Sequence, residues 1–173
     1  MRQIEPQLVQ EMVKAGCVLV ENQQDIQRLV DLTVLPNGTP NKKFVGKNAS
    51  VILDAAHIPY NGDPRLIIMR APKNHPFAVI EMLMPILPVV TVDSFDEGLD
   101  VCLMLEAGLH HTATMHSLNM ERLNRMARKM KTSIFVKNGP SYAGLGFSGE
   151  GTTTFTIATP CLLYTSPSPR DTE

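Results

Sequence analysis

Residues 87–136 read LPVVTVDSFDEGLDVCLMLEAGLHHTATMHSLNMERLNRMARKMKTSIFV and alternate between extended and helical patterns. Residues 87–92 are apolar and β-branched, which is typical of a buried strand. Residues 94–97, Ser-Phe-Asp-Glu, form a capping box, in which the Ser hydroxyl and the Glu side chain satisfy backbone N–H groups at the start of a helix. That helix is apolar on most sides, so we expect it to be buried. Gly108 lies where a left-handed residue ends a helix.

A second strand–helix pair follows directly. Residues 111–116 have a strand pattern, and Ser117 is expected to cap the next helix. Residues 133–136 then add another strand. Strand–helix–strand–helix–strand at this spacing predicts an α/β domain with a mostly parallel sheet and flanking helices. The apolar residues of the second helix are spaced i, i+3, i+4, i+7: Leu123, Met126, Ala127 and Met130.

The first half of the chain has the same alternation. Asn22 is a plausible cap for a helix whose apolar face carries Ile26, Leu29, Val30 and Thr33. Proline and glycine at residues 36–40 and 61–64 predict loops. We further expect helices over residues 5–15 and 48–56 and strands over residues 17–20, 66–69 and 155–157.

The composition is that of a globular protein. Of the 173 residues, 43% are hydrophobic and 19% charged, and the formal net charge is −1. This balance argues against nucleic-acid binding and against a polybasic membrane binder, and no apolar run approaches the roughly 20 residues of a membrane-spanning helix. Residues 1–6 contain no signal-peptide core. Cys17, Cys102 and Cys161 have no C-x-x-C spacing, so we expect a reduced, cytoplasmic protein without a disulfide framework or a zinc site.

Residues 144–149 spell Gly-Leu-Gly-Phe-Ser-Gly, a literal G-x-G-x-x-G. A dinucleotide fingerprint follows a strand directly and opens a helix. Here residues 137–144 intervene, and the β-branched residues 152–156 follow, so we reject the Rossmann interpretation. Such a density of glycine indicates positive φ or close backbone approach, which suits a bare turn and a substrate-lining loop equally well.

Two other features invite a functional interpretation. His110, His111 and His116 suggest a metal site, but adjacent strand residues point to opposite faces, and we expect no metal. Glu81 is the one acid in the apolar run 77–89. Burying a carboxylate is costly unless it is hydrogen-bonded or faces a cleft, and a solvated position at an edge is the alternative.

Residues 81–89, Glu-Met-Leu-Met-Pro-Ile-Leu-Pro-Val, resemble the Glu-x-x-x-Pro-x-x-Pro-Val segment of aldehyde dehydrogenases. In that family the Glu contacts the nicotinamide ribose, so the resemblance implies that Glu81 binds the cofactor. Leu83 stands where the family usually has Phe.

A narrower likeness covers most of the chain up to Pro160. Residues 135–146, Phe-Val-Lys-Asn-Gly-Pro-Ser-Tyr-Ala-Gly-Leu-Gly, are similar to the CoA-acylating propionaldehyde and acetaldehyde dehydrogenases of propanediol and ethanolamine utilisation. Further segments share this likeness: residues 45–50, 62–66, 111–117, 149–151 and 155–160.

The resemblance implies a two-stage reaction. A Cys thiolate attacks a short aldehyde, hydride passes to NAD⁺, and the acyl group moves to CoA. It also implies that Gly144, Gly146 and Gly149 line the substrate or CoA pocket. The parent enzyme is expected to be a homo-oligomer of the cytoplasm or of the lumen of a bacterial microcompartment, associated with its shell.

The resemblance does not place the nucleophile within this chain. Cys17 lies between a helix and a strand, and Cys102 lies in a helix expected to be buried, so we expect the catalytic Cys upstream of Met1. Residues 1–160 are then part of a catalytic domain, inactive alone. Residues 161–173 resemble a translated sequencing adapter or a disordered tail. The alternative is a non-catalytic α/β interaction or scaffold module in a metabolic compartment.

Overall fold

The computed structural model describes residues 1–145, and the chain divides into two compact units, one of residues 1–94 and one that begins at Phe95. Several features predicted from the sequence lie outside the described residues: the strand over residues 155–157, the glycines Gly146 and Gly149, and the tail of residues 161–173. No helix among the described residues has the length and apolar character needed to cross a membrane.

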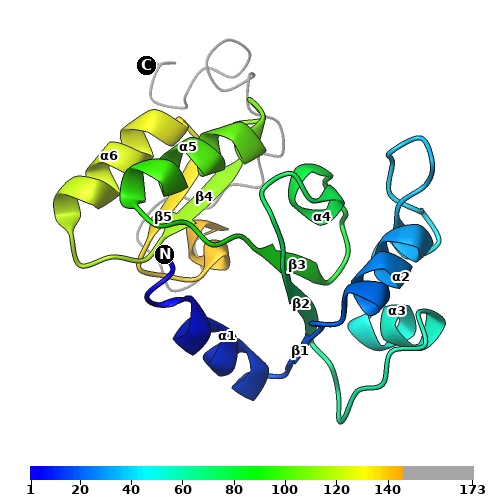
Figure 1. Cartoon of the computed structure of the whole chain (residues 1–173). Helices are drawn as coiled ribbons and strands as arrows, with labels where there is room; N and C mark the ends of the chain where they lie inside the picture. Colours follow the sequence, from blue (N-terminus) through cyan, green and yellow to red (C-terminus); the bar gives the residue numbers. More distant parts are fainter. Residues whose placement is uncertain (146–173) are drawn as a thin grey trace. The chain divides into compact units, whose positions relative to one another are not determined.

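The first unit contains a parallel sheet, as predicted. Its strands are β1 (Cys17–Leu19), β2 (Leu66–Arg70) and β3 (Ile86–Val89), in the order β1-β2-β3 (Figure 1). Ile67 in the middle strand lies beside Val18 on one side and Ile86 on the other. The third strand ends at Val89, three residues before the predicted end at Val92.

Four helices accompany this sheet: α1 (Glu5–Lys14), α2 (Gln23–Thr33), α3 (Ala49–Ala55) and α4 (Pro76–Val79) (Figure 1). Asn22 caps α2 as predicted, since its side chain accepts the Gln24 N–H at 2.9 Å. Thr33 is fully buried and donates its hydroxyl to the Leu29 carbonyl at 2.6 Å, so its polar group is satisfied. The largest fully buried side chains of this core are Leu29, Ile52, Leu53, Ile67 and Met69.

Helix α4 was not predicted, because one turn is too short to show a periodic pattern. Its first residue is Pro76, which suits the first helical position. His75 is the N-cap of this helix: its Nδ1 accepts the Phe77 N–H at 3.2 Å. Burial lowers the pKa of His75 from its ordinary value of 6.5.

Acidification is therefore expected to destabilise the first unit through His75. Because its folded pKa lies below its unfolded pKa, the unfolded chain binds more protons, and the free energy of unfolding falls as the pH drops through 6.5 and below. His75→Asn keeps a capping acceptor that does not titrate. Urea unfolding of both proteins between about pH 7.5 and 5 should give a shallower pH slope for the variant; equal slopes would contradict the assignment.

The second unit pairs two strands in parallel, β4 (Thr112–Met115) and β5 (Ile134–Lys137). Helices α5 (Phe95–Glu106) and α6 (Met120–Met130) pack against each other, and the 3₁₀ helix η1 (Ser141–Leu145) contacts β5 (Figure 1). One buried cluster of this unit comprises Leu99, Ala113, Met126 and Met130, and Leu123 is also buried.

Three details of this unit differ from the sequence predictions. Asn119, not Ser117, caps α6, because the Asn119 Oδ1 accepts the Arg122 N–H at 2.9 Å. The Ser117 hydroxyl instead accepts the Asn119 N–H at 3.1 Å, in the turn before the helix. Helix α5 is only partly buried, and its Met104 is 48% exposed. His111 and His116, the two ends of the predicted strand, lie just outside β4.

Candidate functional site

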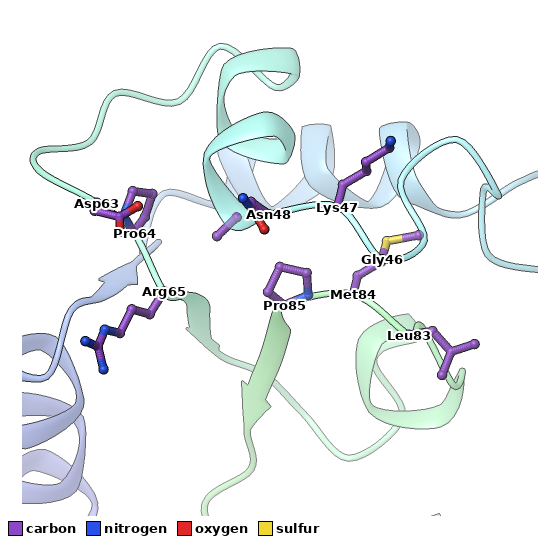
Figure 2. Close-up of a pocket in the computed structure, with 10 residues that line it drawn as sticks. Gly46, Lys47, Asn48, Asp63, Pro64, Arg65, Leu83, Met84 and Pro85 are labelled. Carbon is purple, nitrogen blue, oxygen red and sulfur yellow. The ribbon is translucent and has the colours of Figure 1, made fainter.

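Three loops of the first unit enclose a pocket of about 510 Å³ (Figure 2). The pocket is lined by residues 46–48 with Ala49, the first residue of α3, by residues 63–65 before β2, and by residues 83–85 before β3. The pocket therefore lies at the amino ends of two parallel strands. Its volume is in the range of small-molecule sites.

A backbone hydrogen bond joins two of these loops. The Gly46 N–H donates to the Leu83 carbonyl at 3.1 Å. Leu83 has a φ of +52° and a side chain that is 66% exposed. A left-handed backbone is unfavourable for Leu and persists only where the surroundings fix it. The loop after Glu81 is thus held in one defined conformation beside the pocket.

Polar groups of the pocket are available to a ligand. The side chains of Lys47, Asn48 and Arg65 are exposed, and none makes a hydrogen bond or ion pair with the residues that the structure describes. Asn48 precedes α3 without capping it. In Figure 2 Asn48 and Pro85 lie on opposite sides of the pocket, whereas Lys47 and Arg65 extend outward from it in different directions. These groups can hydrogen-bond polar or anionic atoms.

Glu81 is close to this pocket in the sequence but does not line it. It lies between α4 and β3, two residues before Leu83, and its side chain is exposed. Its carboxylate is therefore solvated. Of the two possibilities for this acid, a buried carboxylate facing a cleft and a solvated position, the structure shows the second. An exposed carboxylate is acceptor-only and accessible to hydroxyl donors.

The glycine-rich segment begins with a tightly packed turn. A Cβ built on Gly144 would lie 2.2 Å from the Ile134 Cγ2, a distance no side chain tolerates. Gly144 is therefore explained by close approach of η1 to β5. Gly146 and Gly149, the other two predicted pocket glycines, lie outside the described residues.

Neither of the two cysteines that the structure describes, Cys17 and Cys102, has the surroundings of an activated nucleophile. Burial raises the pKa of Cys17 at the start of β1 and of Cys102 in α5. Raised values favour the protonated thiol, whereas a catalytic Cys requires the thiolate. This agrees with assigning the nucleophile to neither residue.

The histidine cluster gives no metal centre within residues 1–145, where no group of three metal-ligating side chains occurs. His110 instead lies in a structural network: its Nδ1 is 3.7 Å from the Glu106 Oε2 and 3.3 Å from the Met130 carbonyl. The His111 Nδ1 lies 2.6 Å from the Thr112 hydroxyl.

The sequence did not single out Lys47, Asn48, Asp63 or Arg65 as candidate residues. The available signal was indirect: these residues lie in the two segments, 45–50 and 62–66, that carry the family resemblance. Their convergence with residues 83–85 depends on β2 and β3 being neighbours in the sheet, and sequence patterns do not specify the order of the strands.

No protein-family model matches the chain. Individual relatives do. The propanal dehydrogenase (CoA-propanoylating) of Citrobacter freundii is 52% identical over 154 residues, which cover 88% of this chain and 33% of that protein. The acetaldehyde dehydrogenase (acetylating) EutE of Salmonella typhimurium is 50% identical over 123 residues, or 71% of this chain and 26% of that protein.

The comparison with solved structures finds proteins of the same kind. The propionaldehyde dehydrogenase of Rhodopseudomonas palustris, with bound propionyl-CoA, superposes with a TM-score of 0.88 at 42% identity, covering 92% of this chain and 35% of that one. A propionaldehyde dehydrogenase from the Clostridium phytofermentans fucose utilisation bacterial microcompartment gives 0.85 at 39% identity, covering 90% and 36%. An engineered glycolyl-CoA reductase with bound NADP⁺ gives 0.87 at 42% identity, covering 91% and 36%.

The chain thus spans about a third of the length of the relatives and structures that it matches. The match extends over both units, since it covers about nine-tenths of this chain. Over most of its length, the chain is homologous to CoA-acylating propanal and acetaldehyde dehydrogenases, and the matched segment is about one third of the length of each of those proteins.

Proposed function

We propose that the chain is part of an enzyme that oxidises a short aldehyde with NAD⁺ and transfers the acyl group to CoA. The observation that carries this proposal is identity of about 50% to both CoA-propanoylating and acetylating dehydrogenases over most of the chain. The likeness includes the loops that enclose the pocket as well as the segment that contains Glu81.

The reaction needs a nucleophilic cysteine, which the described residues do not supply. Its thiolate adds to the aldehyde carbonyl carbon, and the adduct loses hydride to become an acyl thioester. The CoA thiolate then displaces the enzyme sulfur, which gives acyl-CoA and restores the enzyme thiolate. The nicotinamide cofactor supplies the hydride acceptor and is released as NADH.

This chain's part in the reaction is to position the cofactor and substrates. The exposed Glu81 carboxylate would accept hydrogen bonds from the nicotinamide ribose hydroxyls. The left-handed Leu83 and its hydrogen bond to Gly46 support this role, because they fix the backbone two residues away. Gly144, Gly146 and Gly149 are proposed to line the substrate or CoA pocket.

The relatives support one part of the proposed setting, the microcompartment. We place the parent enzyme in the cytoplasm or in a bacterial microcompartment lumen, as a homo-oligomer associated with the shell. One structural neighbour comes from such a microcompartment. Residues 1–160 would belong to the catalytic domain and residues 161–173 would lie outside it.

A chimera tests the proposal. Residues 1–160 replace the matching segment of the Citrobacter freundii propanal dehydrogenase, and NADH formation from propionaldehyde is followed by absorbance. We expect NADH formation that requires CoA and disappears when the nucleophilic Cys of the host enzyme is replaced by Ala. A chimera that folds and binds NAD⁺ but forms no NADH would contradict the proposal and favour the scaffold alternative.

A further inference from the structure

Helices α5 and α6 of the second unit lie side by side and run in the same direction (Figure 1). The Phe95 ring, at the start of α5, is 5.6 Å from the guanidinium carbon of Arg122, near the start of α6. Beyond the other end of α5, the His110 Nδ1 is 3.3 Å from the carbonyl of Met130, the last residue of α6. The two helices therefore form one layer, with both amino ends on one side and both carboxyl ends on the other.

The exposed charges of this layer differ between its two ends. The amino half carries four exposed carboxylates and two arginines: Asp96, Glu97, Asp100, Glu121, Arg122 and Arg125. The carboxyl half carries three exposed cations: Arg128, Lys129 and Lys131. Each helix dipole favours acids at the amino end and bases at the carboxyl end, and the two patterns coincide because the helices are parallel. The layer thus has an acidic end and a basic end.

Helix α5 also exposes an apolar residue on this face. Asp96, Asp100 and Met104 are spaced four residues apart, so they lie on one side of the helix. Other sides of α5 bury apolar residues, among them Leu99 and Val101. A helix that is apolar all round is ordinarily covered on every side, yet Met104 is 48% exposed. The composition of α5 therefore indicates that its outer face is covered by a partner.

The division of charge indicates what that partner is. A two-fold axis through the middle of the layer would bring the acidic end of one copy onto the basic end of another, and the reverse. Such a contact is self-complementary, as an isologous interface requires. We propose that the outer face of α5 and α6 is a homodimer contact, through which two copies of this chain pack antiparallel with their Met104 side chains near the axis.

The size of the face sets the strength of the expected dimer. A 12-residue helix is about 18 Å long, and two helices side by side are about 20 Å wide. This area is less than half of the roughly 800 Å² that each partner of a standard interface buries. We therefore expect a weak dimer that depends on its ion pairs. The inference goes beyond the proposed homo-oligomer, because it assigns a surface to the association and does not depend on the enzymatic activity.

Paired charge reversals in the 173-residue chain test the proposal. Asp100→Lys and Lys129→Glu each place like charges at both symmetry-related contacts, so each variant alone should have a dimer Kd raised by about tenfold or more. In an equimolar mixture, the reversed acid of one copy faces the reversed base of the other, and both contacts become favourable. Sedimentation velocity should then give a Kd within about threefold of that of the unmodified chain.

Salt and a control variant complete this experiment. The Kd of the unmodified chain should rise between about 0.05 M and 0.5 M salt, because ions screen exposed charges. Lys42→Glu reverses an exposed cation of the first unit and should leave the Kd unchanged. A monomeric unmodified chain would overturn the inference and leave the face to another partner. Association that neither charge reversal weakens, or that mixing does not restore, would overturn it as well.

Crosslinking gives a second readout that needs no charge reversal. A short bis-maleimide should link two copies of Met104→Cys faster than two copies of Leu118→Cys, with the unmodified chain as the background of its own cysteines. Leu118 belongs to the same unit and is fully exposed, at 101%. Random collisions would favour the more exposed thiol. Linking of Met104→Cys that is no faster than that of Leu118→Cys would therefore overturn the inference.

Discussion

Purified alone, the 173-residue chain is expected to form no NADH from propionaldehyde, NAD⁺ and CoA. Covalent catalysis on an aldehyde needs a thiolate in an accessible, electropositive site. Burial raises the pKa of both Cys17 and Cys102, so both described thiols stay protonated near neutral pH. The homologous enzymes are also about three times as long as the matched segment.

The measurement is NADH absorbance, with the Citrobacter freundii propanal dehydrogenase as the positive control. Circular dichroism of the same sample shows whether the chain is folded when it is assayed. NADH formation that disappears in Cys17→Ala would contradict the prediction and place the nucleophile within this chain. The same loss in Cys102→Ala would have the same meaning for α5.

Apart from α4 and η1, periodic patterns predicted the helices and strands that the structure describes in both units, because most of these elements bury one face. In α6 the predicted stripe of Leu123, Met126 and Met130 is buried. Strand–helix alternation also predicted the parallel pairing. A crossover helix returns the chain to the end of the sheet where the previous strand began, so the next strand runs in the same direction. Burial of one face per element therefore accounts for the fold class.

Competition between two neighbouring capping residues accounts for the wrong prediction of the start of α6. Ser117 and Asn119 are both good capping residues, and their side chains accept from Asn119 and Arg122 respectively. Which of them caps α6 depends on the direction from which the chain enters. That direction is fixed by Asn138, which is 21 residues away from Ser117 in the sequence and bonds to its backbone.

The candidate site was predicted only in part for a related reason. Glu81 was recognisable as an acid within an apolar run, but the pattern gave neither its exposure nor the left-handed turn at Leu83 two residues later. That turn is tied to Gly46, which is 37 residues earlier in the chain. Contacts between distant loops determine the pocket, and a pattern within one segment carries no information about them.

Glu81→Gln in the active chimera is expected to lower kcat/KM for NAD⁺ by about 10- to 150-fold. Hydrogen bonds to a charged group contribute about 1.5–3 kcal/mol, and this range corresponds to that factor in rate. Gln has nearly the same shape and keeps one acceptor oxygen, but it loses the charge. Because Glu81 is exposed and lies outside the core, the substitution should leave Tm unchanged.

Glu11→Gln provides the matched control for the loss of one exposed carboxylate. Glu11 lies on α1 and bonds only to Lys14, at 2.8 Å, among the interactions that the structure describes for its side chain. It should change neither kcat nor the KM for NAD⁺. If Glu81→Gln behaved like Glu11→Gln, Glu81 would have no part in cofactor binding. A deuterium isotope effect with deuterated propionaldehyde adds a second readout, because a misplaced nicotinamide slows the hydride step and makes that step limit the rate.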